Sequence, residues 1–282
     1  MHPCALARLA YWLALAAAML AVCADPASAE GPSDRYWIQI EGFRPAIEST
    51  ARFDVPRLPV QGTEVKFEDE LGLSDSKSLP YFLMGLRLGE RWRLEFEYYE
   101  LNRQGSGTIH RDIRWGDLVF PASSNVASRF DSKIYRFSAG YSFLRNPTAE
   151  LGAALGVHAT DFAIALSGQG SGALGGTPLS GTFQSEENAR VPLPTLGLYG
   201  SYLLSPDWMI RGRADYLSLD YGKYDGSLLN LMGAVTWRFS KNFGAGLGYR
   251  YVDYQLSGTK ERFRGELSYR FRGPAIYLEA VL

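Results

Sequence analysis

The sequence has little cysteine. Its two cysteines, Cys4 and Cys23, both lie within the first 29 residues. If that segment is removed as a leader, the mature chain has no thiol, no disulfide and no cysteine ligand for a metal. We therefore expect no metal site and no cofactor, and a chain that tolerates an oxidising compartment.

Long apolar runs and a charge excess are also missing. Beyond the N-terminal region no run approaches the roughly 18 apolar residues of a transmembrane helix. The chain has 29 basic and 30 acidic residues, a net charge of -1. Without Arg8 and Asp25 of the leader the balance is 28 to 29, again -1. Nucleic acid is therefore not an expected partner, because binding it needs a basic excess.

Residues 1–29 have the three parts of a secretory signal peptide. Arg8 precedes an apolar run from Leu9 to Val22, and the small residues Ala27-Ser28-Ala29 predict cleavage before Glu30. The run is too short for a retained membrane helix. The alternative is a lipoprotein signal ending at Cys23, although the β-branched Val22 is unfavourable there. We predict a signal peptide over 1–29 and one domain over 30–282.

The mature chain is rich in glycine and aromatics, and it divides into segments of alternating polarity. The composition includes 30 Gly, 17 Tyr, 15 Phe and 6 Trp. A period of two predicts β-strands. The segments cover 35–47, 79–89, 91–103, 129–144, 148–165, 190–204, 207–220, 227–239, 242–256 and 261–282.

The linkers between these segments form two populations. Four are tight and rich in turn-forming or polar residues: 89–91, 145–147, 205–207 and 240–242. Three are long, at 48–78, 104–128 and 166–189. Short turns alternating with long loops on an even number of strands are typical of an outer-membrane barrel. We therefore predict an all-β fold, a closed antiparallel transmembrane β-barrel of about ten strands in an up-and-down meander.

The faces of the strands agree with a barrel whose outside is apolar. Arg93, Glu95 and Glu97 alternate with apolar residues, and Arg211, Arg213 and Asp215 do the same. Aromatics cluster near both ends of the apolar face, as the interfacial girdles of such barrels do. Those near the turns are Trp92, Phe143, Trp208, Trp237 and Phe239, and those near the loops are Tyr98, Tyr135, Tyr216 and Tyr251.

Glycines 244, 246 and 248 lie in one such strand. A dinucleotide-binding loop would need a glycine at 249 and then a helix, but Tyr249 stands there. We instead expect lumen-facing gaps that leave room for bulky neighbours such as Arg211, Arg213 and Arg238.

The last segment changes parity at Gly273-Pro274. Phe263 to Phe271 follow one parity, and Ile276 to Leu282 follow the other. We expect a β-bulge between them, because one inserted residue exchanges the faces. The alternative is a tight turn between two short strands.

Several segments carry a resemblance to a known group of proteins. They are Phe67-Glu-Asp-Glu-Leu-Gly-Leu73, 134–143, 224–230, 243–251 and the closing Tyr269-x-x-x-Gly273-Pro274. In these segments the chain resembles the small outer-membrane β-barrel proteins of Gram-negative bacteria, many of which have no assigned function. The resemblance implies a fold and no chemistry. One difference is that such barrels usually finish on an aromatic residue that the insertion machinery reads, whereas this chain ends in Leu282.

Enzyme chemistry finds little support. Outside the leader the only histidines are His110 and His158. The omptin proteases use a His and an Asp two apart beside paired aspartates. Here His110 precedes Asp112 and no Asp-x-Asp pair exists, so a solvated loop histidine is the better interpretation. We expect His158 to fill lumen space or to bond a carboxylate. No Gly-x-Ser-x-Gly elbow occurs, and the Gly/Ser-rich 167–181 resembles a flexible linker.

Charged residues of the predicted inner face are more informative. They could form an ion-pair network that plugs the lumen, since about eight strands leave room only for side chains. Alternatively the arginines could line a narrow pore for small anions. A barrel of ten strands is closer in size to a filled eight-stranded barrel than to an open channel of about 16 strands, so we favour the plugged lumen. The set is Arg87, Arg93, Arg136, Arg211, Arg213, Arg238, Arg250, Arg264 and Arg270, with Glu41, Glu95, Glu97, Glu150, Asp215, Glu266 and Glu279.

The first long loop carries an acidic run, Glu68-Asp69-Glu70, followed by Asp75. Carboxylates suit calcium or magnesium and could bridge to lipopolysaccharide, but the spacing is irregular and a solvated loop is the simpler interpretation.

Taken together, the sequence predicts a monomeric outer-membrane barrel with a structural or surface-interaction role. Its expected partners are outer-membrane lipid, lipopolysaccharide and the barrel-insertion machinery. The alternatives are a narrow passive channel and a hydrolase on the loop side.

Overall fold

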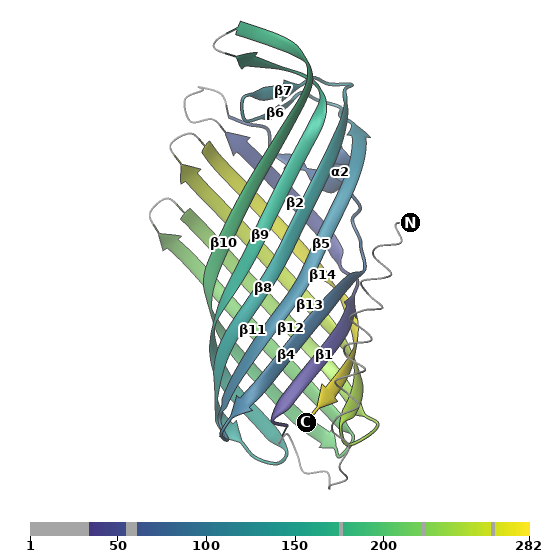
Figure 1. Cartoon of the computed structure of the whole chain (residues 1–282), viewed down its shortest axis with the longest axis vertical. Helices are drawn as coiled ribbons and strands as arrows, with labels where there is room; N and C mark the ends of the chain where they lie inside the picture. The colour runs from purple at the N-terminus through teal and green to yellow at the C-terminus, as the bar shows by residue number, and fades with distance from the viewer. Residues whose placement is uncertain (1–33, 55–60, 175–176, 222–223, 261–262) are drawn as a thin grey trace.

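The chain forms a barrel of antiparallel strands (Figure 1). This computed structural model describes residues 34–54, 61–174, 177–221, 224–260 and 263–282, so the expected leader lies outside the described residues. The elements are β1 (Tyr36–Phe43), β2 (Ala46–Asp54), β3 (Val65–Lys66), α2 (Phe67–Leu71), β4 (Leu79–Leu88), β5 (Trp92–Thr108), β6 (Ile113–Trp115), β7 (Leu118–Phe120), β8 (Asn125–Arg145), β9 (Ala149–Leu174), β10 (Thr177–Ser205), β11 (Trp208–Tyr221), β12 (Tyr224–Arg238), β13 (Phe243–Lys260) and β14 (Phe263–Val281).

The barrel closes between its first and last strands. Barrel neighbours follow chain order from β4 to β14, and β14 pairs with β1. β2 continues β1 along β14, because the pairs Phe43↔Ala275 and Ala46↔Arg272 keep one register across the break at Arg44-Pro45. Counting β1 and β2 as one wall strand gives ten, which confirms the predicted closed antiparallel meander.

The two ends of the barrel differ as predicted. The four tight turns, at 89–91, 146–148, 206–207 and 239–242, lie together at the lower end in Figure 1. Gly89 has a φ of +60°, a conformation that favours glycine. Strands β8, β9 and β10 extend much further at the opposite end, which we call the loop end.

All three predicted long loops contain more structure than expected. Segment 104–128 includes the end of β5, all of β6 and β7, and the start of β8. Segment 48–78 includes most of β2 and all of β3 and α2, so the prediction of a plain loop is wrong. The prediction for 166–189 is also wrong, because β9 and β10 keep pairing up to Leu174↔Thr177. Gly and Ser occupy both faces there and give no apolar alternation, yet continuous ladder hydrogen bonds keep the segment extended.

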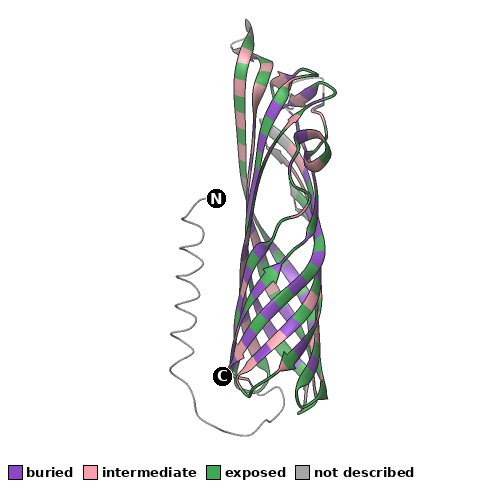
Figure 2. Cartoon of the chain, turned by 90° about the vertical axis from the view of Figure 1, so that its right-hand side faces the viewer, coloured by how far each residue is buried: buried purple, intermediate pink, exposed green. Residues whose placement is uncertain are grey.

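An apolar band surrounds the half of the barrel nearer the turns. Its side chains point outward and include Leu247, which is 66% exposed, together with Leu155, Leu196, Leu198, Ile276 and Leu278. Exposed and buried residues alternate along these strands in Figure 2. The predicted turn-side aromatics Trp92, Phe143, Trp208, Trp237 and Phe239 are all exposed. None of the helices within the described ranges is long and apolar enough to span a membrane.

The interior changes character along the barrel axis. Near the turns its side chains are charged, and nearer the loop end they are apolar. β14 passes through both regions: Leu267, Tyr269 and Phe271 are buried, as is Glu279 further on. All four share one parity.

The predicted bulge at Gly273-Pro274 is therefore wrong. The β13–β14 register runs without a shift from Phe243↔Ala280 to Lys260↔Phe263. The apolar side chains change from outside to inside because their surroundings change, whereas the backbone keeps its alternation.

Candidate functional site: the barrel interior

Ion pairs from opposite walls meet inside the half of the barrel nearer the turns. Arg87 of β4 donates two hydrogen bonds to Glu150 of β9, both 2.9 Å long. Arg93 of β5 donates to Glu95 at 2.5 Å and lies 4.0 Å from Glu150. Planar bidentate pairing of this kind fixes the orientation of both side chains.

A second group lies at the centre. Arg136 of β8 is 2% exposed and pairs with Asp215 of β11 at 2.9 Å and with Glu97 of β5. Arg213 binds Asp215 at 2.7 Å and Glu95 at 2.6 Å. Three strands are thus connected through shared carboxylates, so removal of one charge would leave a buried neighbour unpaired.

A third group completes the network on the remaining wall. Arg250 of β13 donates to Glu41 of β1 at 2.6 and 2.9 Å. Glu279 of β14 accepts from Arg211 at 2.7 Å and lies 3.9 Å from Arg238, which also pairs with Asp34. Of the predicted lumen residues, Arg87, Arg93, Glu95, Glu97, Arg136, Arg211, Arg213, Asp215, Arg238 and Arg250 all face the interior, as do Glu41, Glu150 and Glu279.

Two predicted lumen residues, Glu266 and Arg270, lie elsewhere. Arg270 pairs with Asp253 at 2.7 Å, and its side chain is 37% exposed. Glu266 accepts from Arg52 at 2.5 Å, also outside the barrel. Their placement in the lumen is wrong because the apolar parity of β14 faces inward at this level. The side chain of Arg264 lies outside those that the structure describes.

Aromatic rings lying on lumen-facing glycines were not predicted. An added Cβ at Gly85, Gly152 or Gly246 would lie 2.1–2.2 Å from a ring carbon of Trp37, Tyr199 or Tyr277, respectively. Each ring covers the glycine paired with it on the neighbouring strand. The space at Gly246 is therefore filled by Tyr277, and not by one of the arginines named above.

All three of these rings also contact an arginine. The Arg211 guanidinium carbon lies 5.5 Å from the Tyr277 ring centroid. The Arg93 guanidinium carbon lies 4.9 Å from the Trp37 ring centroid and 4.4 Å from that of Tyr199. Such cation–π contacts stabilise a partly desolvated arginine. Alternating Gly with Trp or Tyr on adjacent strands is a sequence signal that could have indicated these contacts.

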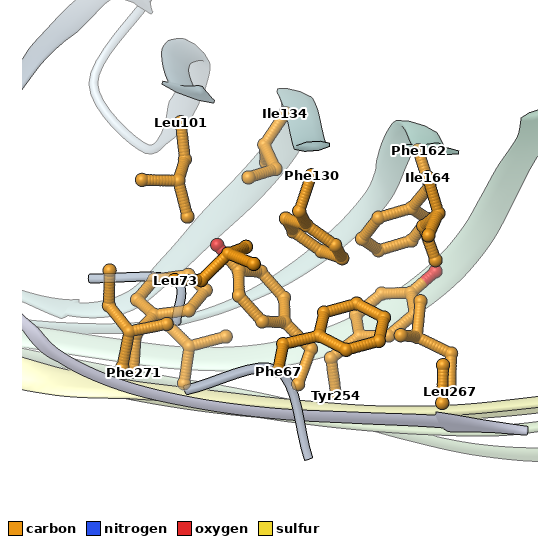
Figure 3. Close-up of a cluster of buried hydrophobic side chains, with 14 of the residues drawn as sticks. Phe67, Leu73, Leu101, Phe130, Ile134, Phe162, Ile164, Tyr254, Leu267 and Phe271 are labelled. Carbon is orange, nitrogen blue, oxygen red and sulfur yellow. The ribbon is translucent and has the colours of Figure 1, made fainter. Parts of the chain in front are cut away.

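Above the charged region, aromatic side chains cross the interior. Phe130 and Phe162 come from β8 and β9, and Tyr254 and Tyr269 come from β13 and β14. The ring centroids lie 5.2 Å apart for Phe130 and Tyr269 and 5.4 Å apart for Phe162 and Tyr254. Figure 3 shows Phe130 and Phe162 reaching toward Tyr254 from the opposite wall.

Residues 65–73, which include β3 and α2, fill the interior at the loop end, and we call them the inserted segment. Phe67 and Leu71 are buried, and the Phe67 ring meets Phe130 edge-on at 5.7 Å. Figure 3 shows Phe67 and Leu73 between the two walls. The i, i+4 spacing of Phe67 and Leu71 was a signal for a helix with one apolar face.

Arg103 of β5 fastens this segment to the wall. Its side chain has no exposed area, and it donates to Glu68 at 2.5 Å and to Ser49 at 2.6 Å. Glu68 also accepts from the Ser49 backbone amide at 2.9 Å. Arg103 was not among the predicted residues, because a single arginine in a long polar stretch carries no distinctive signal.

The hairpin β6–β7 covers the inserted segment. The Trp115 ring lies 4.3 Å from Phe53 and 6.2 Å from Phe67. Arg111 donates two hydrogen bonds of 2.9 Å to Glu70 of α2. Partial burial raises the pKa of Glu70, but the bonds from Arg111 and from the Lys66 amide outweigh it, so the net pKa is lowered.

The acidic run 68–70 is not the solvated loop that was expected, because it belongs to α2 and Glu68 pairs with the buried Arg103. The alternative, a cation site, gains no support. Glu68 and Glu70 are engaged by Arg103 and Arg111. Within the described ranges no group of three His, Cys, Asp or Glu side chains could hold a metal.

Little free space is left within the network. A cavity of about 90 Å³ at the turn end is lined by Arg87, Glu150, Arg238 and Glu279 among others. Ligand pockets usually measure about 300–1,000 Å³, so this cavity suits a few water molecules.

The two histidines lie far apart in the fold. His158 is buried inside the barrel with its ring centroid 6.3 Å from that of Tyr254, so it occupies interior space. His110 is exposed near the loop end, and Asp112 accepts a 2.8 Å hydrogen bond from the Ala122 amide. Asp112 is thus bonded to the loop backbone.

Comparisons with known proteins support the fold. No protein-family model and no curated protein matches the sequence. The outer membrane protease OmpT from Escherichia coli is similar, with a TM-score of 0.56 and 11% identity over 91% of this chain and 99% of that one. The toluene transporter TodX from Pseudomonas putida has a TM-score of 0.34 and 9% identity over 89% and 91%. Ail, the attachment invasion locus protein of Yersinia pestis, has a TM-score of 0.28 and 11% identity over 86% and 99%. At these identities the likeness to OmpT is one of fold, a closed antiparallel barrel.

Proposed function

We propose that this chain is an outer-membrane barrel with a closed, non-conducting lumen, and that its role is carried by the elements at the loop end. The observation that supports this most is the filling of the interior by three successive layers. These are the ion-pair network, the aromatic side chains that cross between walls, and the segment containing α2.

The apolar band supports the membrane location. Leucines that are exposed on a soluble barrel would be costly, whereas in lipid they face a matching environment. Short turns then lie in the periplasm and the longer elements outside the cell. Outer-membrane lipid and lipopolysaccharide would contact the band, and the insertion machinery would assemble the barrel. We expect a monomer.

A narrow anion channel is the competing function. Anion selectivity needs arginines that are available to the passing ion. Here Arg136, Arg213 and Arg250 are each paired with a carboxylate at 2.6–2.9 Å. An ion would have to compete with those carboxylates and then cross the apolar layer, which favours a closed lumen.

Single-channel recording tests the proposal. The refolded chain 30–282 is inserted into planar bilayers, with insertion checked by heat-modifiable migration of the recovered protein and with an open porin as positive control. We expect no conductance steps. Anion-selective steps that change in the Arg213→Gln or Arg238→Gln variants would overturn the closed-lumen proposal and favour the channel.

A non-enzymatic role is part of the same proposal. We expect a His110→Ala variant and the unchanged chain to give the same lipid A and peptide profiles when expressed in matched cells. A profile that changes only with the unsubstituted chain would instead support the loop-side hydrolase.

A further inference from the structure

Strand β10 has a long free edge at the loop end. It pairs with β11 only from Leu196↔Tyr216 to Ser205↔Trp208, whereas its pairing with β9 continues to Thr177↔Leu174. Figure 1 shows the β11–β12 hairpin diverging from β10, and the β9–β10 hairpin extending past the other strands. Along 177–195, the ladders found within the described ranges leave the edge away from β9 unpaired.

Prolines explain why the β10–β11 ladder ends there. Pro194 is the first even-numbered residue beyond Leu196, and Pro192 and Pro178 share its parity. In an antiparallel strand the N–H groups of alternate residues point to the same neighbour. Because the prolines keep regular register with β9, as in Pro192↔Ala159 and Pro194↔Val157, their missing donors face away from β9.

Between Pro178 and Pro192 the same edge keeps its donors. Even-numbered residues there direct both N–H and C=O toward the free side. Twelve or so residues at about 3.4 Å each give roughly 40 Å of edge. Such an edge is a template for pairing with another extended chain, which contributes backbone hydrogen bonds. The exposed side chains along it are Ser180, Thr182, Gln184, Glu186 and Asn188.

The charge on this edge indicates its partner. The segment between Pro178 and Pro192 contains two acids, Glu186 and Glu187, and one base, Arg190. Asp117 lies close enough to Glu187 for the carboxylates to interact, so acids outnumber bases at this edge. Antiparallel pairing with a second copy would bring these acids near their own equivalents, and like charges at close range are destabilising. A segment that carries lysine or arginine would compensate them.

We propose that the β10 edge between Pro178 and Pro192 binds an extended, basic polypeptide segment by β-strand addition. This binding site depends on the proposed function in one respect, namely that the role of the protein is carried by the elements at the loop end. Affinity would come from backbone hydrogen bonds, and the preference for basic residues from the carboxylates.

A defined peptide provides the probe. Full-length mature protein, refolded in a neutral detergent, is titrated into a fluorescein-labelled octapeptide of alternating Lys and Val, and anisotropy is recorded. We expect saturable binding of this peptide. The matched Glu/Val octapeptide should bind at least about tenfold more weakly, because its carboxylates are repelled by those of the edge. A tenfold difference in affinity corresponds to about 1.4 kcal/mol. Carbonyl-labelled peptide should show the infrared shift of a paired strand.

Matched variants locate the contact. Thr182→Pro removes a donor from the free edge while keeping the parity of the three natural prolines, so it should abolish binding, and Thr182→Ala should retain it. Charge reversal of Glu186 and Glu187 to Lys should transfer the preference to the Glu/Val peptide, which provides a second test should the proline variant fail to fold.

Several results would overturn the inference. They are absence of saturable binding, equal binding to the Thr182→Pro variant, and full retention of binding by a Lys/Val peptide N-methylated at consecutive residues, which blocks the N–H donors of both its edges. Conductance measured on the same preparation separates the two proposals. A conducting barrel that binds the peptide overturns only the closed lumen, and a silent barrel that does not bind overturns only the strand-addition site.

Discussion

Arg103 and Glu68 form an ion pair of 2.5 Å that joins the barrel wall to the inserted segment. The arginine comes from β5 and is fully buried, whereas the glutamate comes from α2 and is 14% exposed. The interior of the loop end is therefore fixed by a contact between a wall strand and a segment 35 residues earlier in the chain.

Replacing Glu68 should loosen the inserted segment. The Glu68→Gln change keeps the side-chain shape but leaves the buried Arg103 without its carboxylate, which costs about 3 kcal/mol. We expect that loss in the free energy of unfolding, measured in micelles by urea titration with tryptophan fluorescence, to which Trp115 contributes. Asp69→Asn, on the exposed side of α2, is the control and should change stability by less than about 0.5 kcal/mol. Equal effects of the two changes would contradict a buried link.

The contact between the Tyr277 ring and Gly246 leads to a second prediction. A methyl group there would lie 2.2 Å from Tyr277 and displace a ring whose hydroxyl bonds Thr236 at 2.6 Å. Gly246→Ala should therefore reduce the free energy of unfolding by about 1–3 kcal/mol. Gly233→Ala is the matched control, because its Cβ would point into open space. The loss should shrink in a Tyr277→Ala background, and a loss that persists there would argue against the ring contact.

The position of a residue along β13 should determine how much an outward-facing charge destabilises the folded barrel. Leu247 and Gln255 both face outward, but Leu247 lies in the apolar band and Gln255 beyond it. Leu247→Arg should cost about 2–4 kcal/mol when the barrel is folded in lipid vesicles. Gln255→Arg should be nearly neutral. If the two variants unfold at the same urea concentration, the apolar band does not contact lipid.

The bond between Glu70 and Arg111 predicts a pH dependence. The pKa of Glu70 lies below its ordinary value of 4.5 in the folded state, so the ionised form stabilises the fold. That contribution is complete above about pH 4.5 and is lost as the pH falls through the lower, folded-state pKa. Because Arg111 is 56% exposed, it amounts to at most about 1 kcal/mol.

Thermal unfolding can follow this dependence. The stability difference between the unsubstituted chain and Glu70→Gln should be full at pH 6 and should shrink as the pH falls below 4.5. Glu64→Gln serves as an exposed control in the same region. A difference that stays constant across this range would show that the charge of Glu70 is not involved.

The sequence predicted the half of the barrel nearer the turns well. The alternation of polar and apolar residues placed Arg93, Glu95, Arg213 and Asp215 on the inner face. This worked because, in that half of the barrel, the polar face of each of these strands points inward. The tight turns carried strong local signals, which placed the strand ends within a few residues.

At the loop end the same rule failed. A period of two separates the faces of a strand but does not say which face is inside, so Arg270 was assigned to the lumen while Tyr269 and Phe271 occupy it. The Arg103–Glu68 pair could not be predicted either, because it depends on how a long connection folds back between walls.

The inversion of polarity along β14 bears on how the molecule can fold. Phe271 and Tyr269 face inward, so folding removes them from water whether or not lipid is present. The half of the barrel beyond the apolar band can therefore collapse as a soluble protein does. Leu278 and Ile276 gain only when acyl chains are present. We therefore expect a partly ordered intermediate in lipid-free buffer, with tryptophan fluorescence from Trp115 already quenched or shifted while the opposite half awaits a bilayer.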